Sequence, residues 1–186
     1  TDETSFYYDA VLWAYYRTPD QITAGSDYNE DGELVFNADG LCSRGQVVTF
    51  LWRAAGCPEP ILKVCPFKYV VNEGECGYYY KAILWAYERG IAKGFTEDTF
   101  CPFDPVTRAQ FVTFLYRFVD EPEATRDLSF FSDWEDVEDC FTDSMSWAVA
   151  NGIILGYDGI TLRPNETCFR WTVVTILSRV TDEIPS

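Results

Sequence analysis

The fold is decided by a stretch that the chain repeats three times. The stretch is CSRGQVVTFLWR at residues 42–53, VTRAQFVTFLYR at residues 106–117 and CFRWTVVTILSR at residues 168–179. The arginine in its third place recurs at intervals of 64 and 62 residues. So many aligned positions in three copies indicate an internal repeat.

A second, apolar motif precedes each copy and supplies another helix. It contains Trp13, Trp85 and Trp147, each followed by an alanine. The apolar residues around Trp85 are spaced as on one face of a helix. Gly90 and Gly152 are predicted to end this first helix in the second and third copies. The tryptophan and the repeated arginine are 31 residues apart in the first copy and 23 in the other two.

The second helix of each repeat is predicted to begin at the repeated arginine. Ser43 with Gln46, and Thr107 with Gln110, form a capping box, in which a hydroxyl and an amide satisfy free backbone donors. The predicted apolar face contains Phe111, Phe114, Leu115 and Phe118 in the second copy and Val173, Ile176, Leu177 and Val180 in the third.

One unit of two short helices cannot bury both apolar faces alone, whereas three units packed around a shared axis can. We therefore predict an all-α fold of three helix-loop-helix repeats around a central helix bundle. The predicted repeats are residues 1–60, 61–125 and 126–186, with an insertion at about 15–35 in the first.

The charge and the residue types of the chain exclude several classes of function. The 186 residues include 30 acidic and 14 basic ones, a formal net charge of −16. This argues against binding to nucleic acid or to an anionic membrane through bulk charge, so an anionic partner must be held by a few placed arginines. The absence of histidine excludes Ser-His-Asp and Cys-His nucleophile systems and histidine-ligated zinc.

The sequence contains no apolar run long enough for membrane insertion and no visible signal peptide. Since it opens with Thr1 and Asp2, we expect a mature or excised fragment. The seven cysteines form no CxxC pair. We expect mostly free, buried thiols, with Cys57 and Cys65 as the easiest local disulfide.

The repeats resemble the S-layer homology module, whose copies contain F-x-D-V, then W-A, then G-I-x-x-G-Y-x-D-G-x-F-x-P, then T-R-A-E. The third copy matches this pattern best through its loop, at residues 131–134 and 152–165. The second copy keeps the pattern at residues 90–94 and 107–110.

The resemblance implies a pseudo-threefold helical prism that anchors a secreted protein non-covalently to the bacterial cell surface or cell wall, with no catalysis of its own. The ligand in that family is an anionic secondary cell-wall polysaccharide, often pyruvylated, held in grooves between repeats. The resemblance carries ligand contact over to Arg44, Arg108 and Arg170. An arginine at the first helical position also suits an anion physically, because free backbone donors and the positive dipole end lie there.

Four further residues complete the candidate site. Gly94 and Gly156 would permit close backbone approach, Tyr157 would stack on a sugar face, and Trp85 belongs to the same motif set. Competing interpretations stay open: the repeated tryptophans are packing residues, and each motif arginine pairs with a neighbouring carboxylate. The second arginine of each stretch is interpreted as solvated or bridging, namely Arg53, Arg117 and Arg179.

The third copy departs from the family pattern, because Phe169, Trp171 and Thr172 replace the hydroxyl, the small residue and the acid. We expect this change to remove the side-chain cap and to crowd the pocket beside Arg170. The first copy lacks a clear F-x-D-V leader. The site around Arg108 is therefore the safest candidate.

The insertion contains D-x-N-x-D-G, the opening half of a calcium loop, with Asp27, Asn29 and Asp31 as oxygen ligands. Ala38 stands where the bidentate acid would be expected. A Ca²⁺ site and a polar turn without metal are the two interpretations.

A second function of a different class stays open, namely protein recognition or adhesion through aromatic clusters at residues 7–8, 67–69 and 78–80. A glycosidase built on paired carboxylates has only the abundance of acidic residues in its favour.

Overall fold

The computed structural model describes residues 6–17 and 21–181. Within these ranges the chain is predominantly helical, as predicted. The helices are α1 (Tyr8–Tyr16), α2 (Arg44–Ala54), α3 (Gly74–Glu88), α4 (Arg108–Phe118), α5 (Thr142–Ala150) and α6 (Arg170–Thr181). Two 3₁₀ turns, η1 (Trp134–Asp136) and η2 (Asp139–Phe141), precede α5.

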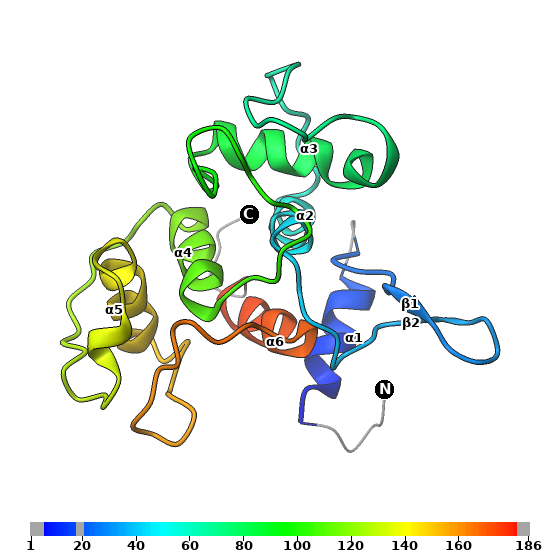
Figure 1. The fold of residues 1–186 in the computed structure, drawn as a ribbon. Helices are drawn as coiled ribbons and strands as arrows, with labels where there is room; N and C mark the ends of the chain where they lie inside the picture. Colours follow the sequence, from blue (N-terminus) through cyan, green and yellow to red (C-terminus); the bar gives the residue numbers. More distant parts are fainter. Residues whose placement is uncertain (1–5, 18–20, 182–186) are drawn as a thin grey trace.

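The helices form an inner and an outer set (Figure 1). Helices α2, α4 and α6 lie around the middle of the molecule, and α1, α3 and α5 lie outside them. Helix α3 packs on α2, α5 on α4, and α1 on α6. Each inner helix is thus covered by the outer helix of the next repeat, and the contact between α1 and α6 closes the ring.

A ring of three backbone hydrogen bonds joins the inner helices just before they begin. The N–H of Cys42 donates to the carbonyl of Cys168 (2.8 Å), that of Val106 to Cys42 (2.9 Å), and that of Cys168 to Val106 (2.9 Å). All three residues are buried. Because each repeat supplies one member, this ring fixes the relative positions of the three inner helices.

The predicted helix boundaries are confirmed. Each inner helix begins at its repeated arginine, and both predicted capping boxes form, at Ser43 and at Thr107. Gly90 and Gly152 follow the ends of α3 and α5 with φ of 71° and 67°, the left-handed conformation of a helix C-cap. The predicted apolar faces of α4 and α6 lie in one continuous core, with Phe118 partly buried at its edge.

The insertion in the first repeat forms the short antiparallel hairpin β1 (Asp27–Tyr28) and β2 (Leu34–Val35), with Asp27 opposite Val35. The all-helical prediction did not include this hairpin. It forms because Asn29 and Gly32 supply the turn: Oδ1 of Asn29 accepts the N–H groups of Asp31 and Glu33, and Gly32 has a φ of 78°.

The cysteine prediction was partly wrong. Cys65 is a free thiol, so the disulfide to Cys57 is not formed, and only Cys42 and Cys168 are fully buried. Burial raises the pKa of each of these two thiols to about 12. They occupy the backbone ring beside Val106 and pack there as small hydrophobic residues.

Candidate functional site

Each repeated arginine is fixed at a junction between two repeats. The backbone N–H of Arg44 donates to the backbone carbonyl oxygen of Asp104. The N–H groups of Arg108 and Arg170 donate in the same way to the backbone carbonyls of Glu166 and Gly40. The side-chain Nε groups donate to carbonyl oxygens of the same neighbouring loops, at Phe100 (2.9 Å), Leu162 (3.0 Å) and Phe36 (2.9 Å). Three equivalent side chains therefore hold three equivalent loops, and their Nη groups extend beyond the contact.

The three guanidinium groups are buried without an acidic partner. Arg44, Arg108 and Arg170 are 3%, 8% and 2% exposed, and no carboxylate of the described residues lies within ion-pair distance of them. Within the described residues, the three arginines therefore do not pair with neighbouring carboxylates. Burial lowers the pKa of Arg44 and of Arg170, but an arginine stays protonated at neutral pH.

Aromatic rings take over part of the stabilisation of these cations. The Cζ atom of Arg44 lies 5.0 Å from the ring centre of Phe100, and that of Arg170 lies 4.8 Å from the ring centre of Phe36. The Cζ atom of Arg108 lies 5.0 Å from the ring of Tyr157. Such contacts stabilise a cation without neutralising its charge, so an incoming anion still meets a full positive charge.

A hollow opens beside each arginine, and the three hollows are built in the same way. Each contains the arginine of one repeat, the glycine loop and inner helix of the next repeat, and the start of the outer helix after that. We name them the Arg44, Arg108 and Arg170 hollows. Residues from all three repeats line each of these hollows.

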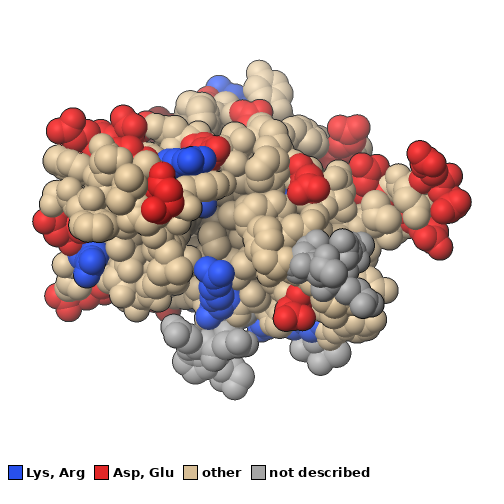
Figure 2. Space-filling model, turned by 90° about the horizontal axis from the view of Figure 1, so that it is seen from below, with Lys and Arg blue, Asp and Glu red and all other residues tan. Residues whose placement is uncertain are grey.

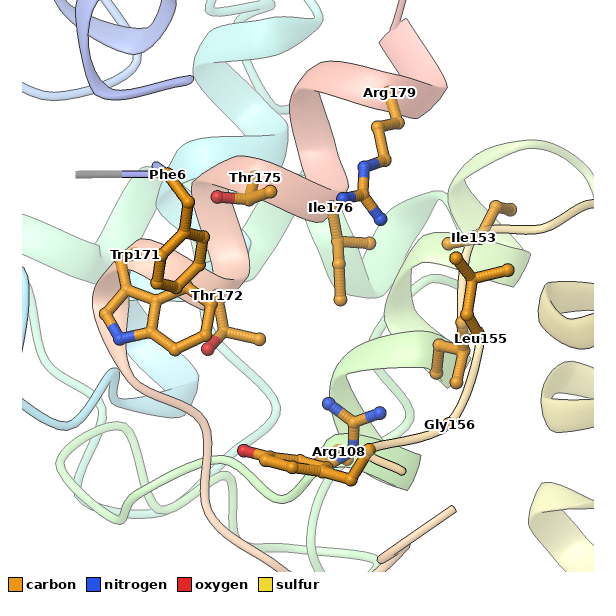
Figure 3. A pocket seen from close by; sticks show the side chains of 12 residues that line it. Phe6, Arg108, Ile153, Leu155, Gly156, Trp171, Thr172, Thr175, Ile176 and Arg179 are labelled. Atoms are coloured by element: carbon orange, nitrogen blue, oxygen red, sulfur yellow. The ribbon is translucent and has the colours of Figure 1, made fainter. Parts of the chain in front are cut away.

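The Arg108 hollow has a volume of about 290 Å³ and contains two arginines. Figure 3 shows the guanidinium groups of Arg108 and Arg179 turned toward the same space, with Phe6 and Trp171 along one side. None of its described lining residues is acidic. Thr175 also lines it, and the buried Oγ1 of this threonine has no hydrogen-bond partner among the described residues.

The Arg44 hollow is larger and more polar, at about 430 Å³. Arg44, Lys93 and Arg117 line it together with Glu138. Lys93 and Arg117 also form ion pairs with Glu121, at 4.0 Å and 3.8 Å. Nη1 of Arg44 donates to the Gln110 side chain, whereas its buried Nη2 has no partner among the described residues. A buried donor without a partner is costly, and an acceptor oxygen placed in this hollow would satisfy it.

The Arg170 hollow is largely satisfied by the protein itself. Its volume is about 250 Å³, and Tyr78 and Tyr79 stand in it. Nη2 of Arg170 donates to Thr23, and Arg53 donates to the hydroxyl of Tyr78 and to the carbonyl of Ile22. The prediction that this pocket is crowded agrees with its lining, but the predicted cause was wrong: Trp171 lines the Arg108 hollow instead.

The second arginine of each stretch, interpreted as solvated or bridging, is bridging at Arg53 and Arg117 and exposed at Arg179. It follows the first by nine residues, which at 100° per residue places it on the opposite side of the helix. Arg117 and Arg179 therefore reach the hollow on the far side of their own helix. The constant nine-residue spacing was the signal that could have identified them.

The other predicted site residues divide into two groups. Gly94 lines the Arg44 hollow, and Gly156 and Tyr157 line the Arg108 hollow. Trp85 is 5% exposed, packs edge-on against Phe118 and lies in the core, away from all three hollows. The packing interpretation of this tryptophan is thus the one that the structure supports.

The two glycines are required by their own loop. They have φ of 98° and 82°, and a Cβ on Gly94 would collide with the carbonyl oxygen of Thr96. The same position on Gly156 lies 3.1 Å from the carbonyl oxygen of Thr161. Their first role is therefore to let the loop turn tightly beside the arginine.

The candidate calcium ligands lie on the exposed hairpin, away from the hollows. Oδ1 of Asp27 accepts the N–H of Tyr28, and its Oδ2 accepts the side-chain amide of Asn37. No group of three or more cysteine, aspartate or glutamate side chains that could hold a metal ion occurs among the described residues. Calcium binding by Asp27, Asn29 and Asp31 stays a prediction.

The aromatic clusters proposed for protein recognition are only partly exposed. Phe67 is buried at 3%, whereas Tyr69 is 84% exposed. Tyr79 is half-buried, and burial raises its pKa. These clusters therefore contribute both to the core and to the surface.

The charge is unevenly distributed. Figure 2 shows acidic side chains on the outer parts of one face, including the protruding hairpin, with few basic side chains between them. The arginines of the hollows thus form local cationic points in an acidic protein. None of the helices in the described part of the chain has the length and apolar character of a membrane span.

The fold and the hollows together define a closed module of repeated helix pairs with an arginine at each junction. Residues 71–112 and 130–168 match the family model of the S-layer homology domain, so these two segments belong to the S-layer homology family. The first repeat lies outside the matched residues, although α2 repeats the same cap, arginine and backbone contacts.

One curated protein is also similar. The chain is 32% identical over 112 residues to the Surface-layer 125 kDa protein of Lysinibacillus sphaericus. The aligned residues make up 58% of this chain and 9% of that protein, so the chain corresponds to a small part of it.

Proposed function

We propose that this chain is a cell-surface anchoring module that binds an anionic, carboxylate-bearing cell-wall polysaccharide in the Arg44 and Arg108 hollows. The family match and the surface-layer relative support the anchoring role. The module would bind without catalysing a reaction, and its host would be a secreted bacterial surface protein.

A single observation carries this proposal. Among the described residues, two buried side-chain polar atoms have no hydrogen-bond partner, namely Nη2 of Arg44 and Oγ1 of Thr175, and each belongs to a residue that lines a different open hollow. Neither residue lines the Arg170 hollow, whose arginine donates to a group of the protein itself. Since buried polar groups are normally satisfied, a ligand with acceptor oxygens is the partner that these two hollows lack.

The chemistry of the hollows favours a carboxylate. A guanidinium offers parallel donors that match the two oxygens of a carboxylate, and each open hollow adds a second arginine from the next helix. The anion is bound in a protein of net charge −16, so attraction must come from these local groups. We therefore expect binding to weaken as the salt concentration rises.

The test is a pull-down on purified cell-wall sacculi before and after removal of the secondary polymer. We expect wild-type binding to require the polymer. We expect Arg108→Ala and Arg179→Ala each to reduce binding at least about tenfold, the loss of one charge-assisted pair. Arg126→Ala, an exposed arginine outside the arginine hollows, is the matched control.

Undiminished binding to stripped sacculi would contradict the proposal and favour the protein-recognition alternative. Thermal unfolding of each variant separates lost binding from lost structure. Arg179 is the cleaner substitution, because it is exposed and has no hydrogen bond or ion pair within the described ranges.

A further inference from the structure

A cluster of four aromatic rings borders the Arg108 hollow. Trp171 is its centre: Phe6 meets it edge-on at 4.8 Å, and Tyr7 and Phe169 stack on it at 5.7 Å and 6.4 Å between ring centres. We call these four residues the aromatic wall. Phe6 is 76% exposed and Phe169 is 38% exposed, so the wall is only partly covered by the protein.

The other two inner helices carry no counterpart of Phe169 and Trp171. The positions of Phe169 and Trp171 are held by Ser43 and Gly45 in α2 and by Thr107 and Ala109 in α4. The hydroxyl at the first of these positions caps its helix in both other repeats. Phe169 cannot cap α6 with a hydroxyl, so this helix begins with two large rings instead, of which Trp171 is partly buried against the core.

A ring could not be placed at the equivalent position of α2 without displacement. A Cβ on Gly45 would lie 2.8 Å from the carbonyl oxygen of Pro102 and 2.9 Å from the ring of Tyr79. At α6, Tyr7 takes the equivalent place of Tyr79 but stacks on Trp171. The residues at the start of α1 therefore pack around the indole of Trp171, and Phe6 lies at the edge of the hollow.

Two rings of the wall and the two arginines line one hollow. Phe6 and Trp171 line it together with Arg108 and Arg179, and none of its described lining residues is acidic. In Figure 3 the two rings form one side of the space into which the guanidinium groups point. A ligand whose anionic group meets the arginines can therefore extend over the rings without meeting a like charge.

We propose that the aromatic wall is a second subsite, which takes the apolar face of a neutral sugar ring joined to the acidic sugar held by Arg108 and Arg179. This inference rests on the proposed function and names the part of the glycan beside the anion. Large, partly exposed aromatic surfaces bind well to rings with one apolar face, and exposed apolar patches beside polar groups mark ligand grooves.

The test uses fragments of the secondary polymer released from the same sacculi and sorted into single acidic residues and two-residue fragments. Titration calorimetry is done on the full chain in an Arg117→Ala background, which weakens the Arg44 hollow. We expect the two-residue fragment to bind about tenfold more tightly than the single residue, the gain typical of stacking on an aromatic side chain.

Substitutions in the wall should change this ratio. Trp171→Ala and Phe6→Ala should each reduce the ratio to within about threefold of unity, because they weaken the two-residue fragment more than the single residue. Trp171→Phe should keep most of the ratio. Tyr7→Ala is the matched control, because Tyr7 belongs to the wall and stacks on Trp171 but does not line the hollow.

The outcomes separate the two proposals. If Phe6→Ala and Trp171→Ala keep the wild-type ratio, the second subsite is wrong while anchoring stands. If Tyr7→Ala lowers the ratio as much as they do, the wall acts only by holding α1 on α6, and the subsite is again wrong. If the parent chain binds neither fragment and does not bind sacculi, both proposals fall.

Discussion

At the scale of single residues, Arg108 combines a structural contact with the proposed binding role. The Nε group of Arg108 holds a carbonyl of the next repeat, and its remaining donors lie beside the hollow. The structural contact therefore fixes the orientation of the binding group before a ligand arrives. Such preorganisation reduces the entropy lost on binding.

This double role gives different expectations for the same substitution at two sites. Arg108→Lys and Arg170→Lys should each lower the free energy of unfolding by about 1 kcal/mol, because lysine cannot reproduce the Nε bond. Only Arg108→Lys should also weaken binding to sacculi, at least about tenfold, since the Arg170 hollow is satisfied internally. Urea unfolding and pull-downs measure the two effects, and equal loss of binding in both variants would contradict the assignment.

The buried thiols of the backbone ring predict a sensitivity to alkaline pH. Cys42 and Cys168 have a pKa of about 12 when folded, against 9.0 for an ordinary thiol. An unfolded chain therefore loses these protons first, so the stabilisation is complete below pH 9 and is lost progressively between pH 9 and about 12.

The matched variant for this prediction is supplied by the second repeat. Cys42→Val with Cys168→Val copies Val106 at all three ring positions. We expect this double variant to remain folded and to lose less stability than the wild type between pH 9 and 11, measured by urea unfolding. Identical pH profiles for the two proteins would show that other groups, such as the half-buried Tyr79, dominate.

At the scale of elements, the tight loop beside each arginine depends on its glycine. Gly94→Ala should lower the free energy of unfolding by more than about 2 kcal/mol, because strain at positive φ adds to a collision with the Thr96 carbonyl. Gly32→Ala is the control, with a positive φ but open space around it, and should cost only about 1 kcal/mol. Equal losses in thermal or urea unfolding would mean that the collision is relieved.

The inner helices could be predicted from sequence because their signals are local. The capping residues Ser43 and Thr107 indicate where α2 and α4 begin, and Gly90 and Gly152 indicate where the outer helices α3 and α5 end. The hairpin was missed because its strands contain only two residues each, too few for an alternating pattern to appear. Short elements of this kind are fixed by their turn.

The composition of the hollows was less predictable, because each hollow combines residues distant in sequence. Trp171 follows Arg170 directly, yet it lines the hollow of Arg108. Adjacent helical residues point in directions about 100° apart, so neighbours in sequence serve different junctions. Which outer helix covers which inner helix decides the rest, and no local signal encodes that choice.

At the scale of the whole molecule, the contact between α1 and α6 makes the repeats one cooperative unit. Val11 in α1 is buried in the common core. We expect Val11→Ala to lower the free energy of unfolding by about 2 kcal/mol and to lower the hydrogen-exchange protection of the amides of Cys42, Val106 and Cys168 equally. Val71→Ala, at a residue 55% exposed, is the control. Loss of protection at Cys42 alone would show that the repeats unfold separately.

The shared construction of the hollows has a consequence for recombination between repeats. The third repeat gives Arg170 to one junction, Gly156 and α6 to another, and Glu138 to the last. Exchanging that segment for a homologous copy would therefore change the lining of all three hollows at once. Under the proposed function, the ligand preferences of the three hollows would change together. Moving a single repeat into another protein would not carry one complete hollow with it.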